Sequence, residues 1–199
     1  MTVNFTSWKG ITDGQTYGIP DSEDFEHNDL DGIYDGDLSA FEIQDTNVDE
    51  GTYALESDGD ETHNGIVRTT RDEPWDRLGL KIEWRQYATS NANGGLLLID
   101  GQDPSNSQGY IIQIRTDNGE VWISEWDGTY QTTLSTTSAN TTTGQFIDCS
   151  LEMSQNGDLD FVADGDSVSV NDSSQTDLYL GFHVYRGQQY IDDVQFSKL

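Results

Sequence analysis

Several stretches of the sequence alternate apolar residues with aromatic rings, amides and arginines. The alternation runs through residues 78–89, 110–116 and 178–185. Because successive side chains of a β-strand point to opposite faces, each stretch predicts one apolar face and one face of rings and hydrogen-bonding groups. Rings of this kind stack on sugars, and amides and guanidinium groups donate hydrogen bonds to hydroxyls. The residues predicted to share one glycan-binding face are Arg85, Tyr87, Gln113, Arg115, Trp126, Tyr179, His183 and Tyr185.

Two tryptophans lie close together in residues 120–126. Trp122 and Trp126 share a face of their predicted strand, so either can join the glycan-binding face. Two alternatives stay open: the tryptophans can pack into the hydrophobic core, or the whole face can be covered by a loop or a partner.

Motifs for several other chemistries are absent from the sequence. His27, His63 and His183 show no metal-ligand spacing, and no P-loop, dinucleotide fingerprint or Gly-x-Ser-x-Gly motif occurs. Cys149 is the only cysteine, which excludes an internal disulfide. Because Cys149 lies in a strand-like run, we expect a buried, inert thiol.

Acidic residues dominate the composition. The chain carries 37 Asp and Glu against 9 Lys and Arg, a formal charge of −28 on 199 residues. Like charges at this density repel one another in dilute buffer, and molar salt removes most of that repulsion by shortening the Debye length to about 3 Å. The surplus therefore indicates a halophilic archaeon or a virus of one. High net charge also occurs in disordered chains, but the 11% of aromatic residues predicts a folded core.

The charge and the hydropathy pattern also limit the partners. Nucleic acid is excluded because phosphate contacts need a basic patch, and an anionic membrane surface would repel the chain. No stretch approaches about 18 consecutive apolar residues, so no membrane insertion is predicted. Residues 1–20 lack a basic region followed by an apolar one, and no signal peptide is predicted there.

Short strand-like runs, separated by Gly, Asn or Asp, make up most of the chain. The predicted strands are Leu38–Gln44, Thr52–Ser57, Gly65–Thr70, Leu78–Thr89, Gly94–Asp100, Tyr110–Thr116, Glu120–Trp126, Tyr130–Ser135, Gln145–Ser154, Leu159–Ala163, Ser167–Val170, Leu178–Tyr185 and Gln189–Ser197. Asn118-Gly119 predicts a type I′ hairpin turn with two positive φ angles, and Asp127-Gly128 and Asn156-Gly157 predict two more turns. Many short strands at regular spacing predict an all-β sandwich or barrel.

The chain length favours one domain. Residues 24–199 are predicted to form it. Residues 1–23 are polar with scattered rings (Phe5, Trp8 and Tyr17) and predict an N-terminal arm or an extra edge strand that could dock on a partner.

Four stretches, in this order, resemble the concanavalin A-like jelly roll of laminin G-type and glucanase-type modules. They are Asp24-Phe25-Glu26, residues 50–56 (EGTYALE), residues 109–134 with their Asn-Gly hairpin and Trp126-Asp127-Gly128, and the pair 181–184 (GFHV) and 190–196 (YIDDVQF). The resemblance spans residues 24–197 and implies an antiparallel β-sandwich, a concanavalin A-like jelly roll. Carbohydrate-binding modules of the related jelly-roll type share several of these stretches, and that branch stays open. The fold hosts lectins, hydrolases and adhesion modules alike.

The resemblance also implies a structural Ca²⁺, since similar modules bind one where the opening strand lies beside the closing strand. Its implied ligands are Asp24, Glu26, Asp192 and Asp193. Ca²⁺ takes six to eight oxygens, so backbone carbonyls would have to add to these carboxylates. Asp192 has the strand parity of the apolar Tyr190, Val194 and Phe196 and is predicted to point inward. The alternative is that Asp192 and Asp193 are ordinary surface acids.

Glucanases of this fold carry a Glu-x-Asp-x-x-Glu strand, and no segment of this sequence has that form. Glycoside hydrolysis needs two suitably placed carboxylates, so we predict a protein without enzymatic activity. A divergent glycosidase is kept as an alternative.

A recognition module without a signal peptide suits a virus, because virion proteins reach the outside by lysis. We therefore expect a virion surface protein, such as a capsid decoration, turret or tail-fibre component. Its expected partners are a host-surface glycan or glycoprotein, other virion proteins and further copies of itself. The alternative is a cellular carbohydrate-binding or adhesion module, extracellular or on the cell surface of a halophile.

Overall fold

The computed structural model describes residues 25–26, 30, 34–36, 38–59, 65–69, 75–76, 78–101, 103–129 and 131–199. The strands are β1 (Tyr34–Gly36), β2 (Phe41–Gln44), β3 (Ala54–Gly59), β4 (Gly65–Thr69), β5 (Trp75–Asp76), β6 (Leu80–Ala88), β7 (Asn93–Ile99), β8 (Gly109–Arg115), β9 (Glu120–Trp126), β10 (Gln131–Ser138), β11 (Phe146–Met153), β12 (Asp158–Ala163), β13 (Asp166–Asn171) and β14 (Asp177–Lys198). The 3₁₀ turns are η1 (Leu38–Ala40) and η2 (Pro104–Asn106). Within these residues, no helix has the length and hydropathy needed to cross a bilayer.

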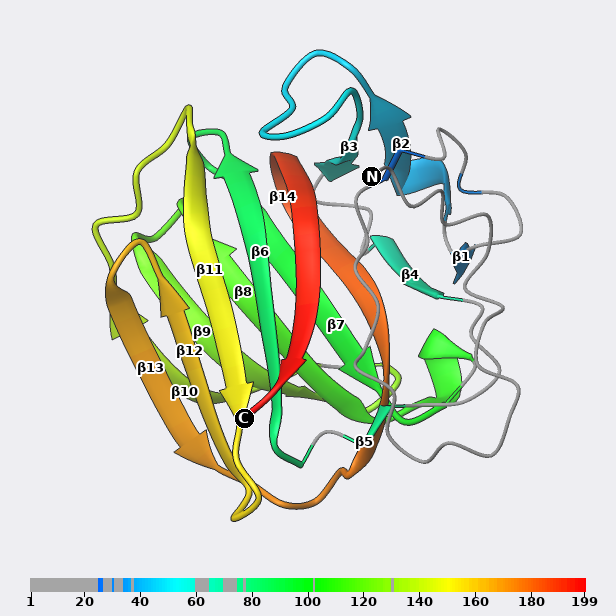
Figure 1. Cartoon of the computed structure of the whole chain (residues 1–199), viewed down its shortest axis with the longest axis vertical. Helices are drawn as coiled ribbons and strands as arrows, with labels where there is room; N and C mark the ends of the chain where they lie inside the picture. Colours follow the sequence, from blue (N-terminus) through cyan, green and yellow to red (C-terminus); the bar gives the residue numbers. More distant parts are fainter. Residues whose placement is uncertain are drawn as a thin grey trace.

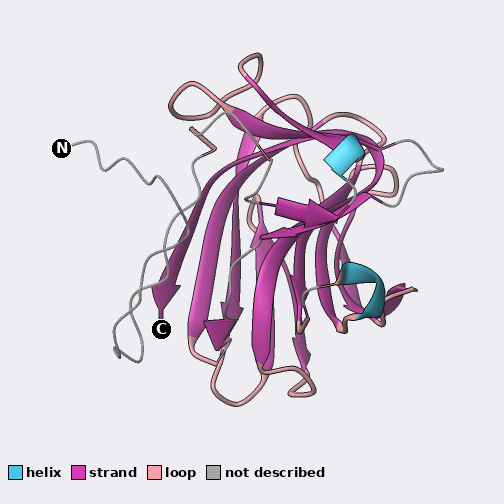
Figure 2. Ribbon diagram, turned by 90° about the vertical axis from the view of Figure 1, so that its right-hand side faces the viewer, coloured by secondary structure: helices cyan, strands magenta, loops and turns pink. Residues whose placement is uncertain are grey.

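The strands form two antiparallel layers that pack face to face (Figures 1 and 2). Sheet I runs β10-β9-β8-β7-β14-β4-β1, and sheet II runs β13-β12-β11-β6-β14-β3-β2. Strand β5 pairs with the start of β14. The β-sandwich predicted from the alternation is confirmed.

Strand β14 belongs to both layers. Its first half pairs with β7 and β4, and its second half pairs with β6 and β3. The change of sheet falls at Gly187, whose φ is +69°. A Cβ there would lie 2.8 Å from both the Cα of Ala92 and the carbonyl oxygen of Asn91, so the crossing requires glycine.

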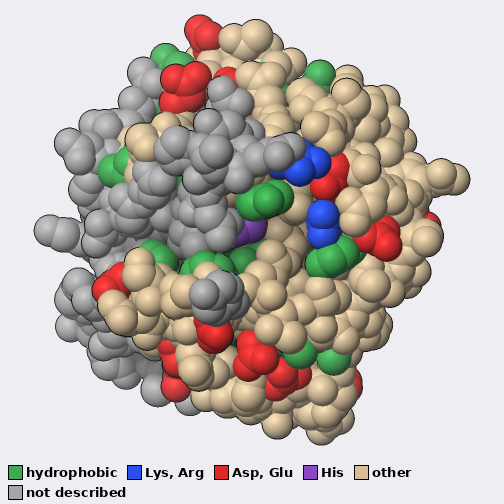
Figure 3. All heavy atoms as spheres, turned by 180° about the vertical axis from the view of Figure 1, so that it is seen from behind, with side chains coloured by type: hydrophobic (Ala, Val, Ile, Leu, Met, Phe, Trp, Pro, Cys, Tyr) green, Lys and Arg blue, Asp and Glu red, His purple; other side chains and the backbone are tan. Residues whose placement is uncertain are grey.

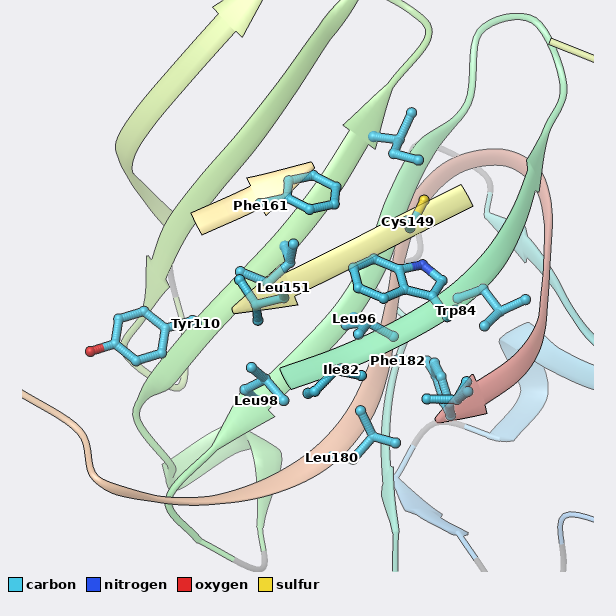
Figure 4. Packing of buried hydrophobic residues seen from close by; sticks show 14 of the residues in the cluster. Ile82, Trp84, Leu96, Leu98, Tyr110, Cys149, Leu151, Phe161, Leu180 and Phe182 are labelled. Atoms are coloured by element: carbon cyan, nitrogen blue, oxygen red, sulfur yellow. The ribbon is translucent and has the colours of Figure 1, made fainter. Parts of the chain in front are cut away.

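The core fills the space between the sheets. In β6 the burial alternates along the strand, as the sequence pattern predicted. Trp84 of sheet II stacks on Phe161 with ring centroids 5.6 Å apart, and from sheet I Leu96 and Phe182 are fully buried against the same core (Figure 4). Cys149 is also buried there, and burial raises the pKa of its thiol well above the usual value.

Most predicted strands are observed, with two differences in how they join. The last two predicted strands form the single strand β14, and residues 38–40 form a 3₁₀ turn. The type I′ turn predicted at Asn118-Gly119 is wrong, because only Gly119 takes a positive φ (+66°). Four residues separate the paired Arg115 and Glu120, and a loop of that length is usually built around a type I turn.

The positive φ pair of a type I′ turn occurs instead at Asp164 (+51°) and Gly165 (+87°), between β12 and β13. The predicted arm, residues 1–23, lies outside the described residues, as does Asp24.

Candidate functional site

The outward surface of sheet I holds two zones of different chemistry. We call this surface the outer face of sheet I. Its apolar zone is a cluster that is buried although it faces away from the core, and it consists of Leu97, Ile99, Ile111, Trp126 and Tyr179. Trp126 Nε1 donates to the carbonyl oxygen of Pro104 at 2.9 Å, so η2 packs over this end of the face.

The polar zone follows directly along the same strands. Register places His183, Gly95, Gln113 and Trp122 side by side across β14, β7, β8 and β9. Gln113 Nε2 donates to Asn93 Oδ1 at 2.9 Å and lies 3.2 Å from His183 Nδ1. Because Gly95 has no side chain, His183 and Gln113 can meet across it.

The amide network continues to the edge strand β10. Gln131 Nε2 donates to Gln113 Oε1 and, at 2.8 Å, to Ser124 Oγ. Gln113 and Ser124 are fully buried. The orientation of the Gln113 amide is therefore fixed by partners on both sides.

His183 is neutral in this network. Burial lowers its pKa to about 4. The Gln113 amide group donates toward Nδ1, which assigns the proton of the ring to Nε2. A second proton on Nδ1 would face the Gln113 N–H group and is disfavoured.

Two arginines, two rings and two carboxylates meet at the β8–β9 end of the polar zone. We call this group the Trp122 corner, and its members are Arg115, Asp117, Glu120, Trp122, Tyr185 and Arg186. The Cζ of Arg115 lies 4.1 Å from the ring centroid of Trp122, and that of Arg186 lies 5.8 Å from the Tyr185 ring. Figure 3 looks onto this face, where basic side chains adjoin hydrophobic ones and a histidine.

A β-bulge in β14 brings Tyr185 and Arg186 to the same face. The register shifts between Val184, which pairs with Gly94, and Arg186, which pairs with Asn93. A bulge places two residues opposite one and re-aims a side chain. Strict alternation would have turned Arg186 toward the core, which explains why the sequence pattern did not find it.

The predicted glycan-binding residues lie in three places: the polar zone of sheet I, its apolar zone, and sheet II. The structure brings Gln113, Arg115, His183 and Tyr185 together in the polar zone. Trp126 and Tyr179 lie on the same face but in the buried apolar zone, and Trp122 is the half-buried tryptophan beside the arginines.

Placing Arg85 and Tyr87 on this face was wrong, because β6 belongs to sheet II. Arg85 Nε lies 2.8 Å from Asp49 Oδ2, and its Nη1 pairs with Asp148. Tyr87 packs edge-on against Phe146 and Tyr190. Alternation alone does not tell which of two sheets a strand joins.

Sequence analysis missed several members of the polar zone. They are Asn93, Asp117, Ser124 and Gln131, polar residues that no motif or alternation in the sequence marks as members of a site. Their partners come from other strands, so only strand register could have found them.

The acids predicted to bind calcium instead anchor residues 49–53. Glu26 Oε1 accepts from the amides of Thr52 (2.6 Å) and Tyr53 (2.9 Å). Asp192 Oδ2 accepts from the amides of Asp49 (2.9 Å) and Glu50 (3.1 Å).

These acids do not fit a calcium site on their own. Asp192 Oδ1 accepts from the Asp193 amide, and Asp193 Oδ1 accepts from Gln195 Nε2. In the part of the chain that the structure describes, no three His, Cys, Asp or Glu side chains gather to hold a metal. The described carboxylates therefore fall short of the six to eight oxygens that Ca²⁺ takes.

The predicted inward direction of Asp192 is also wrong. Asp192 pairs with Arg85, whose side chain faces outward from sheet II. A second bulge of β14, between Asp192 and Gln195, changes the parity before the buried Val194 and Phe196. Asp193 takes a φ of +48° there. Asp192 is nevertheless buried, and burial raises its pKa to about 6 against the lowering effect of its three N–H donors.

Solved structures share this architecture. The carbohydrate binding module CBM66 from Bacillus subtilis has 12% sequence identity and a TM-score of 0.59, and the match covers 80% of this chain and 96% of that one. The GH16 protein of a mixed linkage glucan locus of Bacteroides ovatus, in complex with a G4G4G3G product, has 11% identity and a TM-score of 0.65 over 88% of this chain and 99% of that one. The VIP36 exoplasmic/lumenal domain, in a Ca²⁺/Man3GlcNAc-bound form, has 9% identity and a TM-score of 0.55 over 81% and 85%.

These similarities define the class of fold. The chain is an antiparallel β-sandwich of the galectin- and concanavalin-like jelly-roll type, as the resemblance in the sequence implied. At the level of sequence, neither a family profile nor a curated protein matches the chain.

Proposed function

We propose that this protein is a non-catalytic carbohydrate-binding jelly roll whose ligand site is the polar zone of sheet I. The observation that carries the proposal is the half-buried Trp122 with the Arg115 guanidinium against its ring, beside the hydrogen-bonded amide network of Gln113. The ring supplies apolar contact and the guanidinium groups supply directional hydrogen bonds, while the buried amide network holds the strands beneath them in place. Structures of the same fold that are described as a carbohydrate binding module and as a carbohydrate recognition domain add support.

The distribution of carboxylates favours binding over hydrolysis. Among the described residues, the outward positions of β7, β8, β10 and the central part of β14 hold no Asp or Glu. Glu120, at the end of β9, accepts hydrogen bonds from Trp122 Nε1 at 2.9 Å and Asn118 Nδ2 at 2.8 Å. The other carboxylate beside Trp122 is that of Asp117, which is 7% exposed and bound by Arg115 and Arg186. It is therefore shielded from a bound sugar, whereas glycoside hydrolysis needs two carboxylates that flank the sugar.

Glycan binding in molar salt tests this proposal. We expect the wild-type protein to retain at least one host polysaccharide on a glycan array, and Trp122→Ala to lower the affinity at least about 10-fold, since buried tryptophans often dominate binding energy. Tyr87→Ala, which removes a ring from the other sheet, is the matched control. If no polysaccharide binds, the domain has a purely structural role. Turnover of a bound polysaccharide, abolished by one carboxylate substitution, would establish the glycosidase alternative.

We also propose that the domain works in near-saturating salt on the surface of a haloarchaeal virion, bound to a host-surface glycan or mounted on other virion proteins. The acid surplus supports the salt adaptation. Capsid and portal genes beside this gene would support the virion, whereas neighbouring cell-envelope genes would support a cellular adhesion module. Light scattering in molar salt would measure the proposed self-association.

We propose separately that a structural Ca²⁺ binds beside Glu26. One of its implied ligands, Asp24, lies outside the described residues, so the proposal needs a direct test. If the ion binds there, a chelator lowers the melting temperature in molar salt, since a ligand bound only to the native state stabilises it. An unchanged melting temperature refutes the calcium site.

A further inference from the structure

We propose that the glycan bound by the polar zone carries an anionic group, a carboxylate or a sulfate ester, and that Arg115 and Arg186 bind this group. The inference rests on the proposed function and names the chemical class of the ligand. It comes from the arrangement of charges at the Trp122 corner, where two arginines contact Asp117 while Glu120 is held by Trp122 Nε1 and Asn118 Nδ2.

Asp117 lies beneath the two guanidinium groups. Its carboxylate accepts from Arg115 Nε at 3.3 Å and Nη2 at 3.1 Å, and it lies 3.7 Å from Arg186 Nη1. The side chain of Asp117 is 7% exposed, whereas those of Arg115 and Arg186 are 17% and 26% exposed. The positive groups therefore lie between the carboxylate and the solvent.

The orientation of Arg115 leaves one edge toward a ligand. Asp117 engages Nε and Nη2, and the ring of Trp122 supports the guanidinium plane at 4.1 Å. The Nη1 edge is the one that can meet an anionic oxygen. A guanidinium held on a ring and a carboxylate loses little entropy on binding, and its hydrogen bonds to anions are short and strong.

A second arginine site of the same molecule has a more negative balance of charges. On sheet II, Arg85 alone contacts the carboxylates of Asp49 and Asp148, so negative charge is in excess there. At the Trp122 corner, two arginines lie beside two carboxylates, Asp117 and Glu120, so the formal charges balance. Only six of the 199 residues are arginine, and this pair lies beside the rings and amides of the polar zone.

The net charge of −28 does not prevent an anion from binding in salt. In dilute buffer, the field of the acidic surface opposes the approach of an anion. Molar salt shortens the Debye length to about 3 Å, which removes this repulsion but leaves direct contacts. Molar chloride competes for the same groups, so the ligand must gain from bidentate geometry and from simultaneous contact with Trp122.

Matched glycan pairs in molar KCl test the inference by isothermal titration calorimetry. One pair is an oligogalacturonate and its methyl ester, and the other is a sulfated galactan oligosaccharide and its desulfated form. We expect the wild type to bind the charged member of at least one pair 10-fold or more tightly, a difference of at least about 1.4 kcal/mol. The pair that shows the preference identifies carboxylate or sulfate as the anionic group.

Arg115→Gln is expected to remove this preference, and Arg115→Lys, which keeps the charge but loses the planar fork, to reduce it. Arg85→Gln on sheet II is the matched control and should leave the preference unchanged; circular dichroism verifies the fold of each variant.

Equal binding of charged and uncharged partners, with Trp122→Ala still abolishing both, overturns the anionic ligand and leaves the proposed function intact. Failure of all four glycans and of the wider array overturns both proposals.

Discussion

His183 and Asp192 are buried ionisable residues whose pKa values move in opposite directions for one reason. Loss of hydration disfavours the charged form, so it lowers the pKa of His183 to about 4 and raises that of Asp192 to about 6. Stability linked to His183 is therefore lost as the pH falls from about 6.5 to 4. Stability linked to Asp192 is lost as the pH rises from about 4 to 6.

His183→Gln separates these two effects. The unfolded chain protonates His183 near pH 6.5 and the native state only near pH 4, so the wild type loses up to about 3 kcal/mol through this residue between those values. In the variant that loss is absent. The measurement is chemical denaturation of both proteins in molar salt at several pH values, with the difference between them plotted against pH. A difference that stays constant from pH 7 to about pH 4 contradicts a neutral, buried His183.

Residue types alone indicated part of the candidate site. Gln113, Arg115, His183 and Tyr185 were identifiable because each alternates with core residues on a regular strand. Arg186 was not, because a bulge breaks the alternation, and Arg85 was misplaced, because a strand of either sheet shows the same pattern. The partners of Gln113 are fixed by register between strands that are distant in sequence.

At the scale of elements, β14 decides how the two sheets meet. It contributes core residues to both layers and carries two bulges and one positive-φ glycine along its 22 residues. The sequence identified both halves as strands. It did not show that they join, because a glycine between two predicted strands usually indicates a turn.

Gly187→Ala is expected to destabilise the fold by about 2–4 kcal/mol, because it adds a left-handed conformation to a close backbone contact. Gly165→Ala is the control, since Gly165 has a φ of +87° with nothing within 4 Å of an added Cβ. The control should cost only about 1–2 kcal/mol. Urea denaturation of the three proteins gives the comparison. Equal losses in the two variants would show that the contact with Ala92 does not matter.

At the scale of the whole molecule, the net charge of −28 links stability to salt. Acids are spread over turns and outer strand faces, so their mutual repulsion acts on the entire compact state. The sequence predicted this property directly, because net charge needs no knowledge of the fold.

The free energy of unfolding is expected to rise as KCl increases from about 0.1 M to molar concentration, because the Debye length falls from about 10 Å to about 3 Å. Sucrose is the control, since it stabilises proteins by exclusion from their surface without screening charge. Thermal melts in both series provide the measurement. A melting temperature that is flat in KCl, or that rises equally in sucrose, would show that screening is not the cause.

The sharing of β14 between both layers has a mechanical consequence. A pull on the end of this strand loads its hydrogen bonds to β6 and β3 first and those to β7 and β4 behind them. These bonds lie across the direction of the force and must break together. A jelly roll tethered along β14 therefore transmits tension through both sheets.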